Sequence, residues 1–324
     1  MLAGQIIQRR KIELVDHPEP VPGKSGEIVF QPEIACLCGS DVPYFVAKHP
    51  EYPLQVGLSL HEMVGTVLWA DGSRFREGQK VLAVPTNHVG IFERFAITEN
   101  FVVPLDLRRP LEEMILCQPL GTVLYGLRLL PTLLGWNVVV VGQGPIGQLF
   151  CGVLRNLGAR QIIGIDRIAA RLSLSQRMGA TAVINVEQEN PIAAVADLTG
   201  GAMADLVIEA VGHEHQALNL CIDLCRRLGR IHYFGVPPQV IDGIRWRDLM
   251  MKNLSLTTSL GPDFARDYPL AMQWIGEGRI DVRPLVTHSF PLSEIQTAFE
   301  TFSDRKDGAC KVLIRFPAAG AAQP

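Results

Sequence analysis

The chain has 324 residues, of which 48% are hydrophobic and 19% are charged, and its formal net charge is −3. This length predicts two domains, each large enough to bury its own core. The small net charge gives no reason to expect nucleic acid or acidic membranes as partners. The first residues lack the apolar core of a signal peptide, and no apolar run reaches the ~18 residues that cross a membrane. We therefore expect a cytoplasmic protein whose seven scattered cysteines form no disulfide framework.

The first third of the chain favours β structure. Proline and glycine recur at short intervals, and the segments 26–35, 63–70 and 79–84 have the composition of strands. Between residues 110 and 134 the pattern becomes helical, because one face carries Leu120, Leu124, Leu127 and Leu130. We place a β-rich domain at residues 1–118, a second domain at 119–262, and a return segment at 263–324 that completes the first domain.

The segment 137–166 predicts a dinucleotide site. Four valines at 138–141 form a short β-branched run that suits a strand buried on both faces of a parallel sheet. A G-x-G-x-x-G turn follows at once, made of Gly142, Gly144 and Gly147, with Pro145 suited to the first turn of the next helix. Asp166 lies 24 positions after the first glycine, near the spacing of a carboxylate that binds the adenosine ribose.

Strand and helix patterns alternate beyond this segment. We expect strands at 181–184, 205–209, 229–234 and 254–259, and helices at 193–198 and 215–227. Short connections between such elements predict the α/β class with a doubly wound, parallel Rossmann sheet. Cys221 and Cys225 fall one helical turn apart in the last of these helices, where we interpret them as packing residues. A further helix is expected at 268–276, and the final AAGAAQP has the composition of a disordered tail.

A second group of residues indicates a metal site in the β-rich domain. Cys38 lies in the sequence CLCGSD, and His61 and Glu62 lie in LHE. Thiolate, imidazole and carboxylate are ligands that zinc accepts in catalytic sites with one position left open. Each residue taken alone is more often a packing or surface residue, but the three together favour a zinc ion that polarises an alcohol beside a nicotinamide.

These motifs together resemble the zinc-dependent medium-chain dehydrogenase/reductase superfamily, nearest its sorbitol and threonine dehydrogenase branch. The resemblance covers nearly the whole chain, in the order C-G-S-D, H-E, Q-P-L, G-x-G-P-I-G, I-E-A-V-G, F-G-V-P-P, L-S-E-I-Q-T-A-F and K-V-L-I. It implies a GroES-like catalytic domain built from both chain ends and a central Rossmann domain, with the active site between them.

The resemblance also implies roles for individual residues. Cys38 and His61 match the zinc ligands of the superfamily, and Glu62 matches a neighbouring carboxylate that binds zinc in some members. Asp41 matches an acid that orients the ligand histidine, and Ser40 matches a hydroxyl that passes the substrate proton outward. The other matches concern the cofactor: a basic residue that reaches the pyrophosphate, Lys311, and residues that line the nicotinamide pocket, Thr122, Ile146, Val211 and Val236.

Several positions depart from the superfamily pattern. Gln118 stands where this branch usually has glutamate, and a neutral amide is a poor zinc ligand. Four interpretations remain open: Gln118 completes the zinc site in place of Glu62, Gln118 hydrogen-bonds a water on the zinc ion, the adjacent Cys117 replaces it as a ligand, or zinc is weak or absent. Pro43 stands in place of a common relay histidine, and Leu60 in place of the usual glycine before His-Glu.

The segment PTNHVGIFERFAIT lacks the structural-zinc lobe, which has four closely spaced cysteines in many relatives. We therefore expect one catalytic zinc ion and no second one. His49 and His88 are interpreted as surface or loop residues, either of which could line a substrate pocket. In the nucleotide domain, Asp166 would repel a 2′-phosphate and favours NAD, whereas Arg167 and Arg171 could accept a phosphate and leave NADP as the alternative.

The leading functional hypothesis is a zinc-dependent oxidoreductase that transfers a hydride between NAD(H) and a secondary alcohol or its ketone, with a polyol, sugar derivative or hydroxy acid as substrate. Two alternatives remain open: a zinc-independent NAD(P)H reductase acting on an activated double bond or carbonyl, and a nucleotide-binding protein without turnover. As in relatives, we expect a homodimer or homotetramer, for which the apolar segment 254–260 is a candidate sheet edge, unless it is an interior strand.

Overall fold

A computed structural model describes residues 1–21, 25–71, 74–214 and 216–317 of the chain. The chain divides into two compact units. Unit 1 consists of Met1–Gln118, Asp263–Gly278 and Val282–Pro324, and unit 2 consists of Pro119–Pro262 and Arg279–Asp281. His215 and the predicted AAGAAQP tail lie outside the described residues. Within the described ranges, no helix combines the length and the apolar character needed to cross a membrane.

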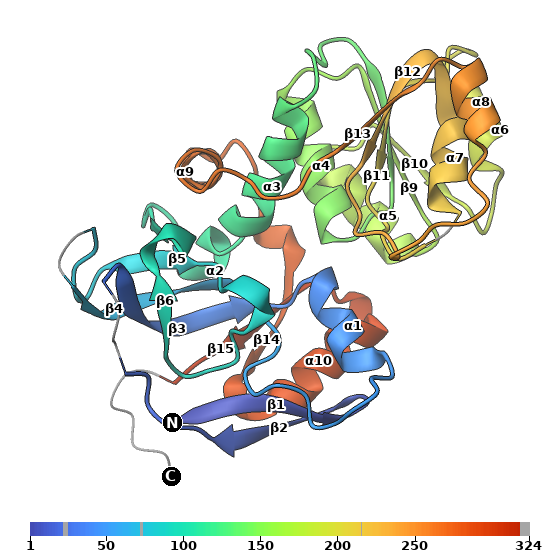
Figure 1. Ribbon diagram of the computed structural model, residues 1–324. Helices are drawn as coiled ribbons and strands as arrows, with labels where there is room; N and C mark the ends of the chain where they lie inside the picture. The colour runs from blue at the N-terminus through green and yellow to red at the C-terminus, as the bar shows by residue number, and fades with distance from the viewer. Residues whose placement is uncertain (22–24, 72–73, 215, 318–324) are drawn as a thin grey trace. The chain divides into compact units, whose positions relative to one another are not determined.

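Unit 2 contains a parallel sheet of six strands (Figure 1). Their order is β10-β9-β8-β11-β12-β13, so the chain starts in the middle of the sheet and winds outward in both directions. The predicted α/β class with a doubly wound Rossmann sheet is therefore confirmed. All five residues of β8 are buried, as its valines require. The strands are β8 (Asn137–Val141), β9 (Gln161–Asp166), β10 (Ala182–Asn185), β11 (Ala204–Glu209), β12 (Cys225–Tyr233) and β13 (Ser255–Thr258).

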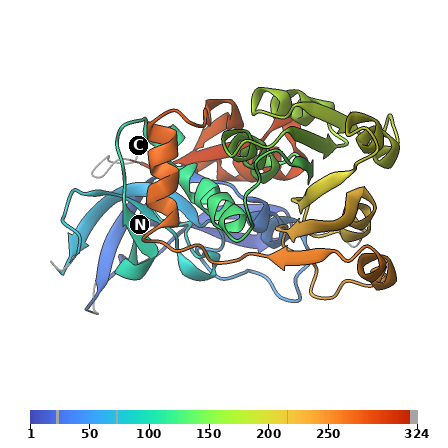
Figure 2. The ribbon, with the colours of Figure 1, turned by 90° about the horizontal axis from the view of Figure 1, so that it is seen from above.

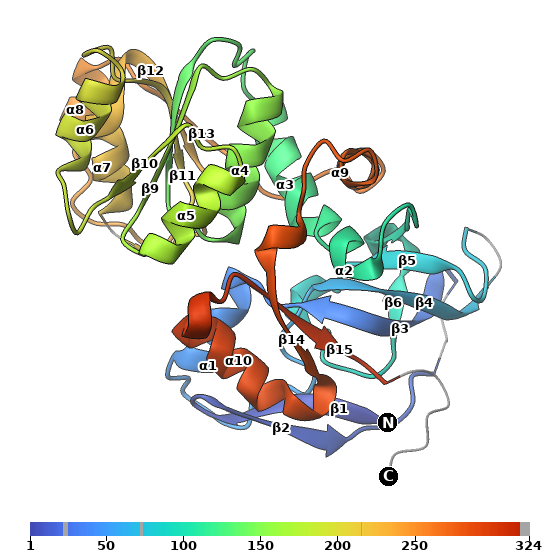
Figure 3. The same ribbon diagram turned by 180° about the vertical axis from the view of Figure 1, so that it is seen from behind.

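Helices cover both faces of this sheet (Figures 1 and 3). α4 and α5 pack together on one face, and α6 and α7 pack together on the other. At the start of α6 the Asn190 side chain accepts hydrogen bonds from the backbone of Ile192 and Ala193, and Pro191 fills the first position. The helices are α3 (Cys117–Arg128), which begins at the end of unit 1, α4 (Pro145–Asn156), α5 (Ala169–Arg177), α6 (Pro191–Leu198), α7 (Ala217–Leu224) and α8 (Trp246–Met251).

The helix predicted at 215–227 is wrong at its C-terminal end. α7 ends at Leu224, and Cys225 already pairs with Ala204 in the sheet. The pairing then skips to Arg230, and Leu228 between them has a φ of 61°. Cys221 and Cys225 are both buried, as packing residues are, but they do not share a helix. Sheet pairing has overridden the local helical preference of the intervening arginines.

Unit 1 is built on a mostly antiparallel sheet of seven strands (Figure 1). The order is β14-β15-β3-β4-β5-β7, with β6 paired to β3. β15 is parallel to β14 and antiparallel to β3, so the end of the chain completes a sheet that its beginning starts. A separate ribbon joins β1 (Leu2–Gln8) and β2 (Lys11–Asp16). The sheet strands are β3 (Glu27–Cys36), β4 (Glu62–Ala70), β5 (Lys80–Ala83), β6 (Phe95–Thr98), β7 (Val102–Pro104), β14 (Val286–Pro291) and β15 (Lys311–Arg315).

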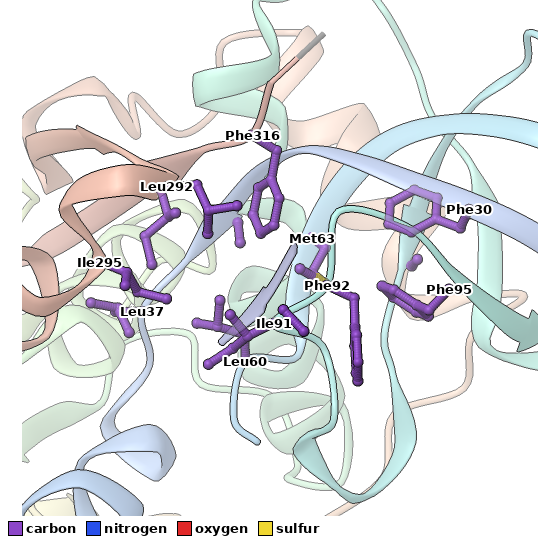
Figure 4. Close-up of a cluster of buried hydrophobic side chains, with 14 of the residues drawn as sticks. Phe30, Leu37, Leu60, Met63, Ile91, Phe92, Phe95, Leu292, Ile295 and Phe316 are labelled. Carbon is purple, nitrogen blue, oxygen red and sulfur yellow. The ribbon is translucent and has the colours of Figure 1, made fainter. Parts of the chain in front are cut away.

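The core of unit 1 is made by both parts of the chain. Figure 4 shows Leu37, Leu60 and Met63 in one buried cluster with Ile295 and Phe316. Burial of such apolar side chains stabilises a fold by roughly 1.5–3 kcal/mol each. The return segment is therefore an integral part of unit 1. The helices of unit 1 are α1 (Val42–Val46), α2 (Leu111–Met114), α9 (Asp267–Gly276) and α10 (Ile295–Asp304).

One ionisable ring lies in the interior of unit 2. His232 on β12 is buried, and its ring nitrogens face the hydroxyls of Thr257 at 3.3 Å and Ser259 at 3.2 Å. Burial lowers the pKa of His232 to about 4. The folded chain therefore keeps this imidazole neutral at a pH where the unfolded chain, with a histidine pKa of about 6.5, already binds a proton.

We predict that acid destabilises the protein through His232. Between about pH 6.5 and pH 4 the unfolded chain binds more protons here than the folded chain, so the free energy of unfolding falls by up to ~3 kcal/mol as the pH drops. In His232→Asn this part of the fall should disappear. Urea denaturation at about pH 7.5 and about pH 5 measures it, with the partly exposed His288→Asn as control. Equal pH dependence in wild type and His232→Asn would contradict the prediction.

Candidate metal and dinucleotide sites

Strand pairing brings the three predicted metal ligands together. The end of β3 pairs with the start of β4, with Cys36 opposite Glu62. Cys38 follows β3 closely, and His61 directly precedes β4. The ligand atoms of Cys38, His61 and Glu62 all lie within 4.8 Å of one another. Three ligands at this spacing could hold one metal ion and leave a fourth position open.

The polar atoms of this group fit a metal ion. The Oε1 oxygen of Glu62 and the Nδ1 nitrogen of His61 are buried, and neither has a hydrogen-bond partner among the described residues. Leaving such an atom unsatisfied costs about 1–3 kcal/mol. Sulfur, nitrogen and oxygen donors together form a ligand set that suits zinc. The residues present therefore fit a zinc ion.

Glu62 gives its other oxygen to Lys311. The Nζ of Lys311 donates to Oε2 of Glu62 at 2.5 Å, and both side chains are 1% exposed. Lys311 also donates to the backbone oxygen of Leu37 at 3.3 Å. Burial raises the pKa of Glu62 above its ordinary value, and the Lys311 ammonium opposes that rise. Burial by itself would lower the pKa of Lys311, but the acidic groups of Cys36 and Glu62 hold it above its ordinary value.

This pairing corrects the role expected for Lys311. A lysine that reaches a pyrophosphate needs an accessible ammonium. The Lys311 ammonium is buried and donates its two hydrogen bonds to Leu37 and Glu62 within unit 1. Breaking a buried pair leaves an uncompensated charge at a cost of about 3–5 kcal/mol. Lys311 is therefore the partner of Glu62. The K-V-L-I motif carries no sign of this contact, because the two residues are 249 positions apart.

Gln118 lies beside two buried residues, Cys117 and Tyr268, whose pKa values are affected by the charge of Glu62. It is 5% exposed, and its amide donates to the hydroxyl of Tyr268 at 3.5 Å, a long contact. Burial, followed by the Glu62 charge, raises the pKa of Cys117 well above its ordinary value. Cys117 belongs to no group of potential metal ligands in the described chain. A thiol that resists ionisation is disfavoured as a replacement zinc ligand. The amide oxygen of Gln118 can still accept a hydrogen bond.

Ser40 and Asp41 lie in η1 (Gly39–Asp41), between β3 and α1. The Oγ of Ser40 is buried without a hydrogen-bond partner in the described chain. The Asp41 carboxylate is 1% exposed and accepts backbone hydrogen bonds from Cys38 at 2.8 Å and from Leu60 at 3.0 Å. Burial raises the pKa of Asp41, but two nearby imidazoles and these backbone donors hold it below its ordinary value. Asp41 therefore ties the loop of Cys38 to the loop of His61.

His88 is a residue of this site that the sequence analysis treated only as a loop or pocket residue. Its ring lies 4.4 Å from that of His61, edge to face, and its Nδ1 lies 4.0 Å from Oδ1 of Asp41. Asp41, His61 and His88 form a second group of potential ligands. The available signal was the position of His88 in the short segment that stands where relatives carry the four-cysteine lobe.

Each glycine of the turn in unit 2 has its own structural reason. Gly142 has a φ of +91°, and a Cβ there would lie 2.9 Å from the backbone of Ala210. A Cβ on Gly147 would lie 1.9 Å from the backbone oxygen of Gly142, so α4 packs directly on the end of β8. At Gly144 the nearest neighbour of a Cβ is Nη1 of Arg171 at 3.9 Å. This position is open, and it is the helix N-terminus that a pyrophosphate would approach.

Asp166 and Arg171 lie beside the turn. The Asp166 carboxylate ends β9 and accepts backbone hydrogen bonds from Gln143 and Arg167, each at 2.8 Å, and from Ile168 at 2.9 Å. Nη1 of Arg171 lies 3.9 Å from Oδ2 of Asp166. The backbone thus fixes the carboxylate in place. Its two oxygens have about four acceptor positions, so capacity remains for a ribose hydroxyl.

The residues predicted to line the nicotinamide pocket all belong to unit 2. Ile146 lies in the first turn of α4 and is half-buried. Val211 and Val236 follow β11 and β12 and are 44% and 53% exposed. Thr122 on α3 donates to the backbone oxygen of Pro119 at 2.7 Å. Apolar side chains beyond the carboxyl ends of parallel strands are available to a ligand ring. Their role in cofactor binding stays a prediction.

Known proteins share these features. Residues 145–277 match the family described as zinc-binding dehydrogenase. The chain is 33% identical to the L-threonine 3-dehydrogenase of Bacillus licheniformis over 204 residues, which are 62% of this chain and 56% of that relative. It is 27% identical over 341 residues to an uncharacterized zinc-type alcohol dehydrogenase-like protein of Escherichia coli K12, covering 94% of this chain and 95% of the relative. The chain is therefore similar to threonine and zinc-type alcohol dehydrogenases, and residues 145–277 carry the zinc-binding dehydrogenase match.

A solved dehydrogenase structure has a similar fold. The alcohol dehydrogenase TADH from Thermus sp. ATN1 matches with a TM-score of 0.87 at 26% identity, covering 97% of this chain and 99% of that one. The matches to the L-threonine 3-dehydrogenases of Bacillus licheniformis and Bacillus subtilis span only about half of those relatives, 56% and 52% of their lengths. The activity of the whole protein is therefore a matter of inference.

We predict that Gly147→Ala disrupts the dinucleotide turn, whereas Gly152→Ala in the same helix does not. A Cβ on Gly147 overlaps the backbone of Gly142, and overpacking of this kind costs about 1–3 kcal/mol. A Cβ on Gly152 meets its nearest atom at 3.4 Å, and alanine favours a helix over glycine by about 1 kcal/mol. We expect NADH binding, followed by fluorescence titration, to weaken by about 10-fold in the first variant only. Equal affinity in both variants would contradict the prediction.

Proposed function

We propose that this protein is a zinc-dependent oxidoreductase that transfers a hydride between NAD(H) and a secondary alcohol or its ketone. The observation that carries the proposal is the convergence of Cys38, His61 and Glu62. Their ligand atoms lie within 4.8 Å of one another, and the buried polar atoms of this group include two without a hydrogen-bond partner among the described residues. The open glycine turn of unit 2 supports the second requirement, a dinucleotide site. A Lewis acid and a nicotinamide together suffice for alcohol oxidation by hydride transfer.

The side chains of unit 1 divide the binding and proton chemistry between them. When bound, zinc supplies a Lewis acid for the substrate oxygen and NAD supplies the hydride acceptor. Cys38, His61 and Oε1 of Glu62 would hold the ion, while Lys311 retains the other Glu62 oxygen. The buried Ser40 hydroxyl, which lacks a partner in the described chain, would relay the alcohol proton: it would accept that proton while it gives its own to a water molecule that leads to solvent.

As substrate we propose a small secondary alcohol with further polar groups: a polyol, a sugar derivative or a hydroxy acid. L-threonine, after which several relatives are named, is itself a small acid with a secondary hydroxyl group. A polarised hydroxyl and a hydride acceptor require only that the alcohol carbon carries a hydrogen, so the remaining polar groups decide selectivity through loops around the site.

A zinc-independent NAD(P)H reductase of the same superfamily is the second candidate, and Gln118 is the observation that favours it. Its amide is neutral and contacts Tyr268 at 3.5 Å, so it contributes no anionic ligand. The ion would then depend on Glu62 as its third ligand, and Glu62 already shares one oxygen with Lys311. The third hypothesis, a nucleotide-binding protein without turnover, leaves the convergence of Cys38 with His61 unexplained.

We propose a homodimer or homotetramer, with β13 as the joining edge. β13 ends the parallel sheet of unit 2, as the orange strand in Figure 2 shows. An edge strand offers unpaired backbone groups to a second chain. Leu256 on this strand is 37% exposed, and Leu260 just beyond it is 92% exposed. The structure thus makes β13 an edge strand, which was one of the two interpretations open for the segment 254–260.

We also propose NAD as the preferred cofactor. Asp166 carries its charge at the end of β9, where the adenosine ribose of a Rossmann ligand binds, and a carboxylate there repels a 2′-phosphate. Arg171 lies 3.9 Å from Asp166, so its guanidinium could pair with that phosphate once the carboxylate charge is removed.

We predict that Asp166→Asn shifts the preference toward NADP. Loss of the negative charge should improve NADPH affinity relative to NADH by about 10-fold, since ~1.4 kcal/mol of repulsion is removed. Adding Arg171→Gln should cancel this gain. Dissociation constants of both reduced cofactors, measured by protein fluorescence, test the prediction. It is wrong if wild type already binds NADPH as tightly as NADH.

We predict that the freshly purified protein holds ~1 zinc ion per chain and oxidises at least one secondary alcohol with NAD. Cys38→Ser should lose the metal and lower turnover at least ~100-fold, because the metal contributes several kcal/mol to catalysis. Cys310→Ser, another buried cysteine of unit 1 outside both ligand groups, is the matched control and should keep the zinc.

Metal analysis and a panel of polyols, sugar derivatives and hydroxy acids measure both quantities. Zinc far below one equivalent, with activity that chelators leave unchanged, would overturn the leading proposal in favour of the reductase. Absence of hydride transfer with every alcohol and carbonyl in the panel would favour a protein without turnover.

A further inference from the structure

A second cluster of polar side chains adjoins the metal-ligand group. The ligand atoms of Asp41, His61 and His88 lie within 4.8 Å of one another, so His61 belongs to both clusters. We propose that His88 is a positioning residue of the metal site: by engaging Asp41 it holds the two loops that carry Cys38 and His61, and so strengthens zinc binding. This inference rests on the proposed zinc-dependent function.

Asp41 joins the two loops that carry the metal ligands. Its Oδ2 accepts the backbone hydrogen bond of Cys38 and its Oδ1 accepts that of Leu60, so each oxygen is already engaged. These donors belong to two segments, one that follows β3 and one that precedes β4. Any group that fixes the Asp41 carboxylate therefore fixes the backbone of Cys38 and the backbone adjacent to His61.

His88 faces this carboxylate. Its Nδ1 lies 4.0 Å from Oδ1 of Asp41, and the Asp41 side chain is 1% exposed. The same nitrogen is buried and has no hydrogen-bond partner among the described residues, and Nδ1 of His61 is in the same condition. A shift of about 1 Å brings an imidazole N–H within hydrogen-bond distance of the carboxylate. A buried carboxylate with two backbone donors retains lone pairs for such a third donor.

The backbone directs His88 toward the site. His88 ends η2 (Thr86–His88) with a φ of 54°, next to Asn87 with a φ of 58°. Such left-handed conformations cost energy, on the order of 1 kcal/mol, and persist where the surroundings determine them. The residues that follow are bound to the segment before His61: Gly90 donates to the backbone oxygen of Ser59 at 3.0 Å, and Ile91 to that of Gly57 at 2.8 Å. The segment that follows His88 is thus hydrogen-bonded to the segment that precedes His61.

The test measures zinc affinity in His88 variants, by competition with a chromophoric chelator after metal removal and reconstitution. His88→Ala removes the ring and should weaken zinc binding about 10–100-fold, the range seen when a residue behind a metal ligand is lost. His88→Asn should stay within about 3-fold of wild type, because its amide nitrogen takes the place of Nδ1 and asparagine tolerates a positive φ. His49→Ala, a half-buried ring outside both clusters, is the control and should not change the affinity.

Two further measurements separate positioning from general stability. Thermal unfolding of the metal-free variants reports the backbone cost of each substitution without zinc. In an Asp41→Asn background, His88→Ala should change zinc affinity less than about 3-fold, because residues that act through one another are not additive. Equal zinc affinity of wild type and His88→Ala, or additive effects in the double variant, would overturn the inference alone. A wild-type chain that binds no zinc would overturn this inference together with the proposed function.

Discussion

The buried contact between Glu62 and Lys311 is the interaction on which unit 1 depends. Neither charge could remain in that interior without the other, since an unpaired buried ion costs several kcal/mol. The pair links β4 to β15 across the intervening strand β3, and it holds the carboxylate in position. It also sets the charge of the site. The Lys311 ammonium opposes the rise in the pKa of Glu62 that burial causes, and so favours the carboxylate form that can bind a divalent ion.

The candidate ligand sites of the two units differ in how they are formed. In unit 1 the site is made of side chains held by other side chains, and polar atoms such as Oε1 of Glu62 have no hydrogen-bond partner among the described residues. In unit 2 the site is made by the absence of side chains, because Gly142 and Gly147 allow a strand and a helix to touch and Gly144 leaves the helix end uncovered. A substitution in the first site removes a chemical group, whereas a substitution in the second obstructs the ligand or the turn.

Features encoded in a short stretch of sequence could be predicted, and features that depend on distant residues could not. The valines of β8 and the glycines after it are local signals, and the fold class followed from them. The end of α7 could not be predicted, because only pairing with Ala204 makes Cys225 part of a strand. The types and order of Cys38, His61 and Glu62 indicated a metal site. The partner of Lys311 and the place of His88 beside Asp41 depend on contacts across the sheet and between loops, which leave no trace in a single sequence.

The insertion of unit 2 into unit 1 has a consequence for synthesis on the ribosome. Every strand of unit 2 has been made before β14 and β15 exist. Until then the end of β3, at residues 34–36, lacks the neighbour that it later gains, although β6 already pairs with its beginning at residues 27–30. A strand with such an unpaired edge is a template for aggregation. Unit 2 can therefore fold while the nascent chain still grows, whereas unit 1 must wait for the last part of the polypeptide, and the nascent protein is vulnerable for that interval.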